Sequence, residues 1–151
     1  MMGGGQQQLQ QLSQELQALD EEIEALEAEI ADLREEKSDI DDAVEAIETL
    51  ETGSTVQVPL GGGAYVRAEV QDIDEVIVSL GGNYSAEQEQ DDAIDVLRRK
   101  QEALDERIEE TREDVSELES ESQELEQQAQ QMQQQMQQQQ MQQMQQQADD
   151  E

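Results

Sequence analysis

Apolar residues recur at alternating steps of three and four over the first third of the chain, which is the heptad pattern of a coiled-coil helix. From Leu9 to Ile47, eleven of the twelve positions in this pattern are apolar, and Lys37 is the exception. We call these positions the seam of the helix. So narrow an apolar stripe does not stabilise a lone helix in water, which predicts a partner helix packed along it.

A second and weaker seam runs from Ile94 to Met136, where Gln101, Thr111 and Ser122 interrupt ten apolar positions. The two seams match layer by layer when the helices are antiparallel and paired residues have numbers that sum to 141. A polar residue within a seam, such as Lys37 in the first one, is typical of positions that fix the register.

Charged residues beside the seams support the same register. It brings together four pairs of opposite charge: Asp41 with Arg98, Glu36 with Arg107, Arg34 with Asp105, and Glu27 with Arg112. Each exposed pair contributes at most about 1 kcal/mol, but together they oppose other registers. Toward the chain termini acidic residues face each other, as Glu22 faces Glu121, so this end is expected to be looser unless salt screens the repulsion.

Between the two seams the hydrophobic period changes to that of β-strands. Segments 55–60 and 64–70 flank three glycines, and segments 75–80 and 84–87 flank Gly81-Gly82-Asn83, so each pair predicts a β-hairpin. The fold class is therefore α+β, a long antiparallel α-helical coiled-coil hairpin with two β-hairpins inserted between the helices. Ser85 with Gln88 also matches a helix capping box, which leaves open a helix start at Ala86 beside the favoured start around Gln90 to Asp92.

These patterns divide the chain into four parts. We expect a coiled-coil helix over 9–52, the double β-hairpin over 53–87, and a second coiled-coil helix over 88–136. For the Gln- and Met-rich acidic tail over 137–151 we expect disorder or a frayed helix. Within the tail and before it, Met132, Met136, Met141 and Met144 predict a soft apolar stripe.

Composition restricts the chemistry further. The chain has neither Cys nor His, so common transition-metal ligands and the usual neutral-pH base are missing, and we expect no catalytic, cofactor or metal site. A net charge of −32 argues against nucleic acid as a partner. Acidity spread along the whole chain favours a high-salt cytoplasm over a merely solvating tail. No signal peptide or membrane-length apolar run is recognisable, so a cytoplasmic location is expected.

The triple glycine Gly61-Gly62-Gly63 could suggest a phosphate-binding loop. It is followed by Ala64-Tyr65 rather than by Lys and Ser or Thr, and it precedes a strand rather than a helix. A hairpin turn is therefore the favoured interpretation.

The central block resembles the alpha-type archaeal subunit of the prefoldin family, in the segments VPLGGGAYV (58–66), DEVIVSLGGNY (74–84) and DAIDVL (92–97). The resemblance extends from about Leu9 to Gln128. The Gln- and Met-rich extension and the extreme acidity depart from the family pattern, and the acidity suggests a haloarchaeal source.

The resemblance implies an ATP-independent holdase chaperone, which is not an enzyme and needs no cofactor. Its expected partners are a prefoldin beta subunit, in a heterohexamer of two alpha and four beta chains, unfolded protein clients, and a group II chaperonin; nucleic acid and membrane are not expected. The competing function is a structural coiled-coil adaptor that binds one folded protein.

Two sets of residues are candidates for these contacts. Client binding is expected at the coiled-coil tips, on Leu9, Leu12, Leu16, Leu125, Met132 and Met136. Oligomerisation is expected on the strands, at Val56, Val58, Leu60, Tyr65, Val66, Val70, Val76, Ile77, Val78 and Tyr84. For the tips, a simple frayed coiled-coil end is an equally open interpretation.

Overall fold

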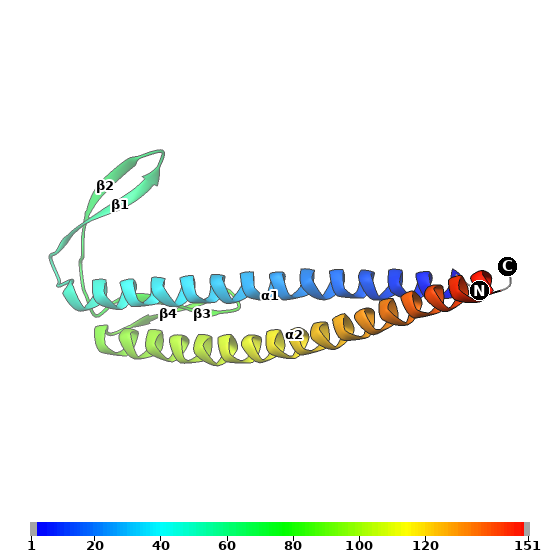
Figure 1. Ribbon diagram of the computed structural model, residues 1–151. Helices are drawn as coiled ribbons and strands as arrows, with labels where there is room; N and C mark the ends of the chain where they lie inside the picture. The colour runs from blue at the N-terminus through cyan, green and yellow to red at the C-terminus, as the bar shows by residue number, and fades with distance from the viewer. Residues whose placement is uncertain (1–2, 150–151) are drawn as a thin grey trace. The chain divides into compact units, whose positions relative to one another are not determined.

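The computed structural model describes residues 3–149. It contains, in chain order, α1 (Gly3–Thr49), β1 (Thr55–Gly61), β2 (Ala64–Glu69), β3 (Val76–Gly81), β4 (Tyr84–Gln88) and α2 (Gln90–Asp149) (Figure 1). The predicted α+β fold, two long helices with two β-hairpins between them, is confirmed. The chain divides into two compact units, which we call the terminal unit (1–31 with 109–151) and the hairpin unit (32–108).

Helix α1 is longer at its start than expected, because it begins at Gly3 rather than at residue 9, and it ends at Thr49 rather than at 52. Carbonyl groups at the end of α1 accept hydrogen bonds from a side chain of the other helix. The Gln90 side chain donates Nε2–H hydrogen bonds to the carbonyl oxygens of Ile47 at 2.7 Å and of Leu50 at 3.4 Å. Such bonds replace those that the end of a helix lacks.

Helix α2 begins at Gln90, where the later of the two expected starts placed it. The alternative start at Ala86 is wrong, because residues 84–88 pair with β3 as a strand. The Gln90 backbone N–H donates to Asp74 Oδ1 at 3.4 Å, and Asp91 and Asp92 lie in the first turn, where negative charge interacts favourably with the helix dipole.

Of the two expectations for the Gln- and Met-rich tail over 137–151, disorder and a frayed helix, the structure shows a helix. Helix α2 continues through it to Asp149, and the last two residues of the predicted tail lie outside the described part of the chain. Gln and Met have good intrinsic helix propensity, and no Gly or Pro occurs after Gly82, so nothing in this segment ends the helix.

The two β-hairpins share one turn design. Each is a two-stranded antiparallel sheet with a two-residue loop. In the first loop the φ angles of Gly62 and Gly63 are 59° and 82°, and in the second those of Gly82 and Asn83 are 58° and 66°. Positive φ at both central residues is the requirement of a type I′ turn, which the twist of a hairpin favours. An irregularity in the pairing precedes each loop, at Leu60 and Leu80. The triple glycine is thus the turn between β1 and β2.

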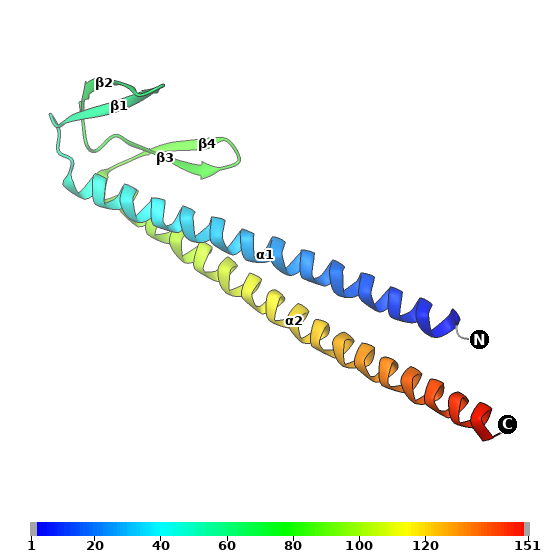
Figure 2. The same ribbon diagram turned by 45° about the horizontal axis from the view of Figure 1, so that its top comes forward.

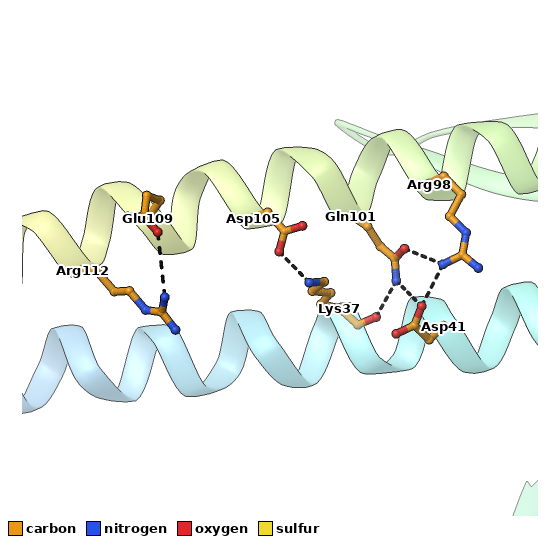
Figure 3. A network of polar contacts seen from close by, with 7 residues as sticks. All are labelled: Lys37, Asp41, Arg98, Gln101, Asp105, Glu109 and Arg112. Atoms are coloured by element: carbon orange, nitrogen blue, oxygen red, sulfur yellow. Dashed lines mark hydrogen bonds and ion pairs between the residues drawn. The ribbon is translucent and has the colours of Figure 1, made fainter.

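Polar contacts link the two helices within the hairpin unit (Figure 3). Arg98 Nη1 lies 2.8 Å from Asp41 Oδ1, which confirms one of the four predicted charge pairs. Asp105, which was expected beside Arg34, instead pairs with Lys37 at 2.7 Å. The seam lysine therefore keeps its stem along the seam and carries its ammonium to a flanking carboxylate, since its side chain is only 38% exposed.

Gln101 joins this network from within the second seam. Its side chain is buried, and its Nε2–H group donates to the Lys37 carbonyl oxygen at 3.0 Å and to Asp41 Oδ1 at 2.7 Å. Its Oε1 accepts from Arg98 Nη1 at 2.7 Å. The hydrogen bond from Gln101, followed by the contact with Arg98, lowers the pKa of the Asp41 carboxyl.

The terminal unit follows the predicted register as well. A Cβ placed on Gly5 would lie 3.3 Å from Met136 Sδ, and the numbers of these two residues sum to 141. The N-terminal end of α1 therefore lies beside the C-terminal part of α2 (Figures 1 and 2). In the same unit Arg112, expected opposite Glu27, lies instead 3.8 Å from Glu109 of its own helix. The predicted contact of Glu36 with Arg107 stays a prediction.

Burial follows the heptads in both units. The buried seam side chains of α1 are those of Ile30, Leu33, Ile40 and Val44. Those of α2 are Gln101, Ile108, Thr111, Val115 and Ser122. The three polar interruptions of the second seam thus keep their seam positions and are buried with the apolar residues, so they do not break the coiled coil.

Candidate functional site

Exposed large apolar side chains concentrate on the β-hairpins. Seven of them lie there, with exposed fractions from 41% to 75%: Val58, Leu60, Tyr65, Val66, Ile77, Leu80 and Tyr84. We call this set the hairpin surface. In a chain with a net charge of −32, so dense a group of exposed apolar residues marks a surface suited to another protein.

The two hairpins differ in how much of their surface the chain itself covers. In β3–β4, Val78 is buried and its cross-strand partner Ala86 is half-buried, while Ile77 on the opposite face is 70% exposed. In β1–β2 only the pair of Val56 with Ala68 is half-buried within the paired strands. One face of β3–β4 is therefore packed, and most of β1–β2 is open.

Each sheet has only two strands, so both strands of each hairpin present unpaired backbone groups at an edge. Isolated two-stranded sheets are marginally stable in water. The bases of the hairpins are anchored, since Gly53 N–H donates to the Val70 carbonyl oxygen at 2.8 Å and Ile73 N–H donates to Thr52 Oγ1 at 3.1 Å. The arrangement offers fixed, apolar strand edges to which further strands can be added.

Of the ten residues predicted for oligomerisation, six belong to the hairpin surface. Val56, Val70 and Val76 are half-buried, and Val78 is buried within the chain. These four valines contribute to the packing of the hairpins themselves. Leu80, which the prediction left out, is 51% exposed. It precedes Gly81-Gly82 as Leu60 precedes Gly61-Gly62, and this parallel is the sequence signal that could have identified it.

The six residues predicted for client binding all lie in the terminal unit and are half-buried. Two of them, Leu9 and Leu16, line an open groove of about 380 Å³ together with Gln10, Ser13, Ala129 and Gln133. The seam residues are thus accessible from one side while the helices remain paired, so the groove offers partly exposed apolar surface without unfolding of the coiled coil.

The predicted methionine stripe lies on two faces of α2. Met132 and Met136 continue the seam and are half-buried, whereas Met141 and Met144 are 70% and 74% exposed. The reason is that α1 begins at Gly3 and Gly5 already lies against Met136, so within the described part of the chain α2 has no helix beside it further on, and all side chains from 137 to 149 are exposed. The sequence prediction assigned Met132 and Met136 to the client site and left Met141 and Met144 out of it.

No helix among the described residues 3–149 is long and apolar enough to cross a membrane. 

Comparison with known proteins agrees with the fold. The Prefoldin family model, described as "Prefoldin subunit", matches residues 19–142. "Prefoldin subunit alpha" of Halorubrum lacusprofundi is 86% identical over 112 residues, which cover 74% of each chain. "Prefoldin subunit alpha" of Halobacterium salinarum is 71% identical over 108 residues, covering 72% of this chain and 70% of the relative. A cryo-EM structure of filamentous PFD from Methanocaldococcus jannaschii matches with a TM-score of 0.51 and 30% identity, over 78% of this chain and 93% of that chain.

The chain belongs to the prefoldin family. Within that family it is similar to the alpha-type subunits of haloarchaea. The source and the family expected from its acidity and its central block are thereby confirmed, and the chain is a prefoldin chaperone subunit.

Proposed function

We propose that this subunit is an ATP-independent holdase of the cytoplasm that binds non-native proteins at the ends of its coiled coil and passes them to a group II chaperonin. The observation that carries the proposal is the division of accessible apolar surface between two places. One is the hairpin surface in the hairpin unit, and the other is the helix end in the terminal unit.

The hairpin surface suits permanent assembly. Its apolar side chains stand on strands with fixed register and type I′ turns, and its edges require further strands. We assign it to oligomerisation with prefoldin beta subunits, in a heterohexamer of two alpha and four beta chains.

The helix ends suit transient contacts with many different clients. Their apolar residues are Leu and Met on partly covered helices, and the flexible thioether of Met adapts to varied surfaces. Each contact can be weak, because several tips in one assembly engage the same client and raise the effective affinity.

Two variants, each co-expressed with a beta subunit in multimolar salt, test these assignments separately. Replacing the six predicted client residues by Ser is expected to abolish suppression of client aggregation while the mass of the assembly stays that of the wild type. Replacing residues 55–87 by a short Gly-Ser linker is expected to abolish the hexamer. Full aggregation suppression by the six-Ser variant would favour the adaptor function instead, and an unchanged hexamer of the linker variant would remove oligomerisation from the hairpins.

A further inference from the structure

Charge is absent from two segments at the ends of the helices, residues 3–14 of α1 and residues 127–148 of α2. All 8 basic and 40 acidic side chains of the chain lie outside them. Gln fills six of the twelve positions of the first segment and sixteen of the 22 positions of the second, and the other positions are Gly, Leu, Ser, Ala or Met. We call these two segments together the neutral tip.

The terminal unit brings both segments to one place. Met136 lies against Gly5, and Leu9, Gln10 and Ser13 of α1 line one groove with Ala129 and Gln133 of α2. Helix α2 continues thirteen residues past Met136 to Asp149, and every side chain from residue 137 to residue 149 is exposed. The first charged residues behind the tip are Glu15 on α1 and Glu126 on α2.

The side chains of the neutral tip match the groups that an unfolded polypeptide exposes. A Gln amide has donor N–H groups and an acceptor oxygen, so it can pair with either the N–H or the C=O of a client backbone. Met141 and Met144 add exposed apolar area that changes shape at little cost. Neither residue type has a charge that must be desolvated when a client covers it.

We propose that the neutral tip is a binding surface for acidic unfolded polypeptides, an inference that rests on the proposed holdase function. The hairpin surface is also uncharged, but the proposed assembly with beta subunits covers it. The rest of the chain outside the tip is acidic enough to repel a client of like charge. In 1 M salt the distance over which this repulsion acts falls to about 3 Å. Salt does not remove the free-energy cost of burying a carboxylate beneath a client. An acidic client is therefore confined to the tip, whereas a basic client can also bind along the acidic helices.

A charge placed on the tip tests the proposal. The tip variant carries Gln11→Glu, Gln131→Glu and Gln138→Glu, and the control carries Gln17→Glu, Gln71→Glu and Gln123→Glu, all at exposed positions and with equal net charge. The clients are one permanently unfolded basic protein, reduced and alkylated, and the same protein after succinylation of its lysines. Fluorescence anisotropy gives the dissociation constant of each client from the assembled hexamer, at the lowest salt concentration that preserves its mass.

The wild type is expected to bind both clients. The tip variant should bind the succinylated client about tenfold more weakly than the control variant does, because like charges then meet at the contact. Its affinity for the basic client should not fall. Equal affinities of the tip and control variants for the succinylated client would overturn the proposal. A tip variant whose assembly differs in mass from the wild type would also overturn it, because it would show that the tips bind each other.

Failure of the broader holdase function has a different signature. In that case the wild type binds neither client, or the six-Ser variant binds both as the wild type does. The charge proposal alone fails when the wild type binds both clients, the six-Ser variant binds neither, and the three tip carboxylates make no difference.

Discussion

Gln101 shows how one polar residue serves an apolar seam. It is 7% exposed, yet its amide makes three hydrogen bonds, to the Lys37 backbone, to Asp41 and to Arg98 (Figure 3). A buried polar group is tolerated when its partners are present, and losing it leaves those partners without a bond.

Replacing Gln101 by Ala is expected to lower the free energy of unfolding by about 1–2 kcal/mol, because three hydrogen bonds and buried side-chain volume are lost. Urea titration followed by circular dichroism, at one salt and one subunit concentration, measures the change. Gln123→Ala, an exposed substitution on the same helix, is the control and should change stability by less than about 0.5 kcal/mol. Equal effects of the two substitutions would contradict the role of Gln101.

The same variant makes a prediction about ionisation. The pKa of Asp41 is lowered chiefly by the hydrogen bond from Gln101, so Gln101→Ala should raise it toward the ordinary value of an aspartic acid. A lowered folded-state pKa means that the interaction stabilises the fold above the ordinary pKa and is lost as the pH falls through the lowered value. Carbon-detected NMR titration of the Asp41 carboxyl measures this, and an unchanged pKa in the variant would place the cause elsewhere.

For single residues, the sequence predicted positions in the heptad better than it predicted ion-pair partners. Opposite charges in register predicted the pair of Asp41 with Arg98, which exists, and the pair of Arg34 with Asp105, which Lys37 replaces. Heptad position tells which side chains share a seam, but several long side chains reach the same carboxylate. Gln101 was predicted only as an interruption, because periodicity does not reveal hydrogen bonds.

Among the elements, the antiparallel helices have the register that the heptads and charges predict. The register follows from contacts of both units taken separately, from Lys37 and Asp105 in the hairpin unit and from Gly5 and Met136 in the terminal unit. The paired hairpins were predicted too, since glycines and Asn83 mark their turns. For the Gln-rich tail the sequence left a frayed helix and disorder both open, because a low-complexity composition is typical of disorder while Gln and Met have good helix propensity.

Cysteine cross-linking tests the register directly, because the chain has no native cysteine. The double variant Leu16→Cys with Leu125→Cys should form a disulfide on mild oxidation, since the two positions share a layer. Leu16→Cys with Leu118→Cys, one heptad away, should not. Mobility of the oxidised and reduced chains in denaturing gels measures the yield, and cross-linking of the displaced pair in preference to the first would refute the register.

The terminal unit should depend on salt more than the hairpin unit does. Glu22 is placed by the register near Glu121, and Asp20 near Glu119, so their repulsion is relieved when salt screens it, while apolar packing is retained or strengthened. Hydrogen exchange read by mass spectrometry should therefore show faster exchange in residues 9–31 and 109–136 at low salt than at multimolar salt. Residues 32–49 and 90–108 are the internal comparison, and an equal salt response in both would contradict this account.

At the scale of the whole molecule, the chain combines two apolar surfaces with a strongly acidic remainder. The hairpin surface carries seven exposed apolar side chains on strands, and the neutral tip carries Leu, Met and Gln without charge. The proposed function therefore assigns assembly and client binding to different residues in different units. The sequence predicted which of these residues lie on helices and which on strands, but not how exposed each side chain is, because burial depends on packing that periodicity alone does not describe.

Photo-cross-linking to a client tests the central claim most directly, that clients bind at the neutral tip. Two single-cysteine variants are compared: Gln133→Cys lies in the tip, and Glu110→Cys lies on an exposed part of α2 outside it. A benzophenone is attached to the cysteine of each variant, and the hexamer is assembled with beta subunits. An unfolded client is added, the sample is irradiated, and cross-linked client is quantified by mass spectrometry. The account predicts abundant cross-links from position 133 and few from position 110; equal yields, or a higher yield from position 110, would contradict it.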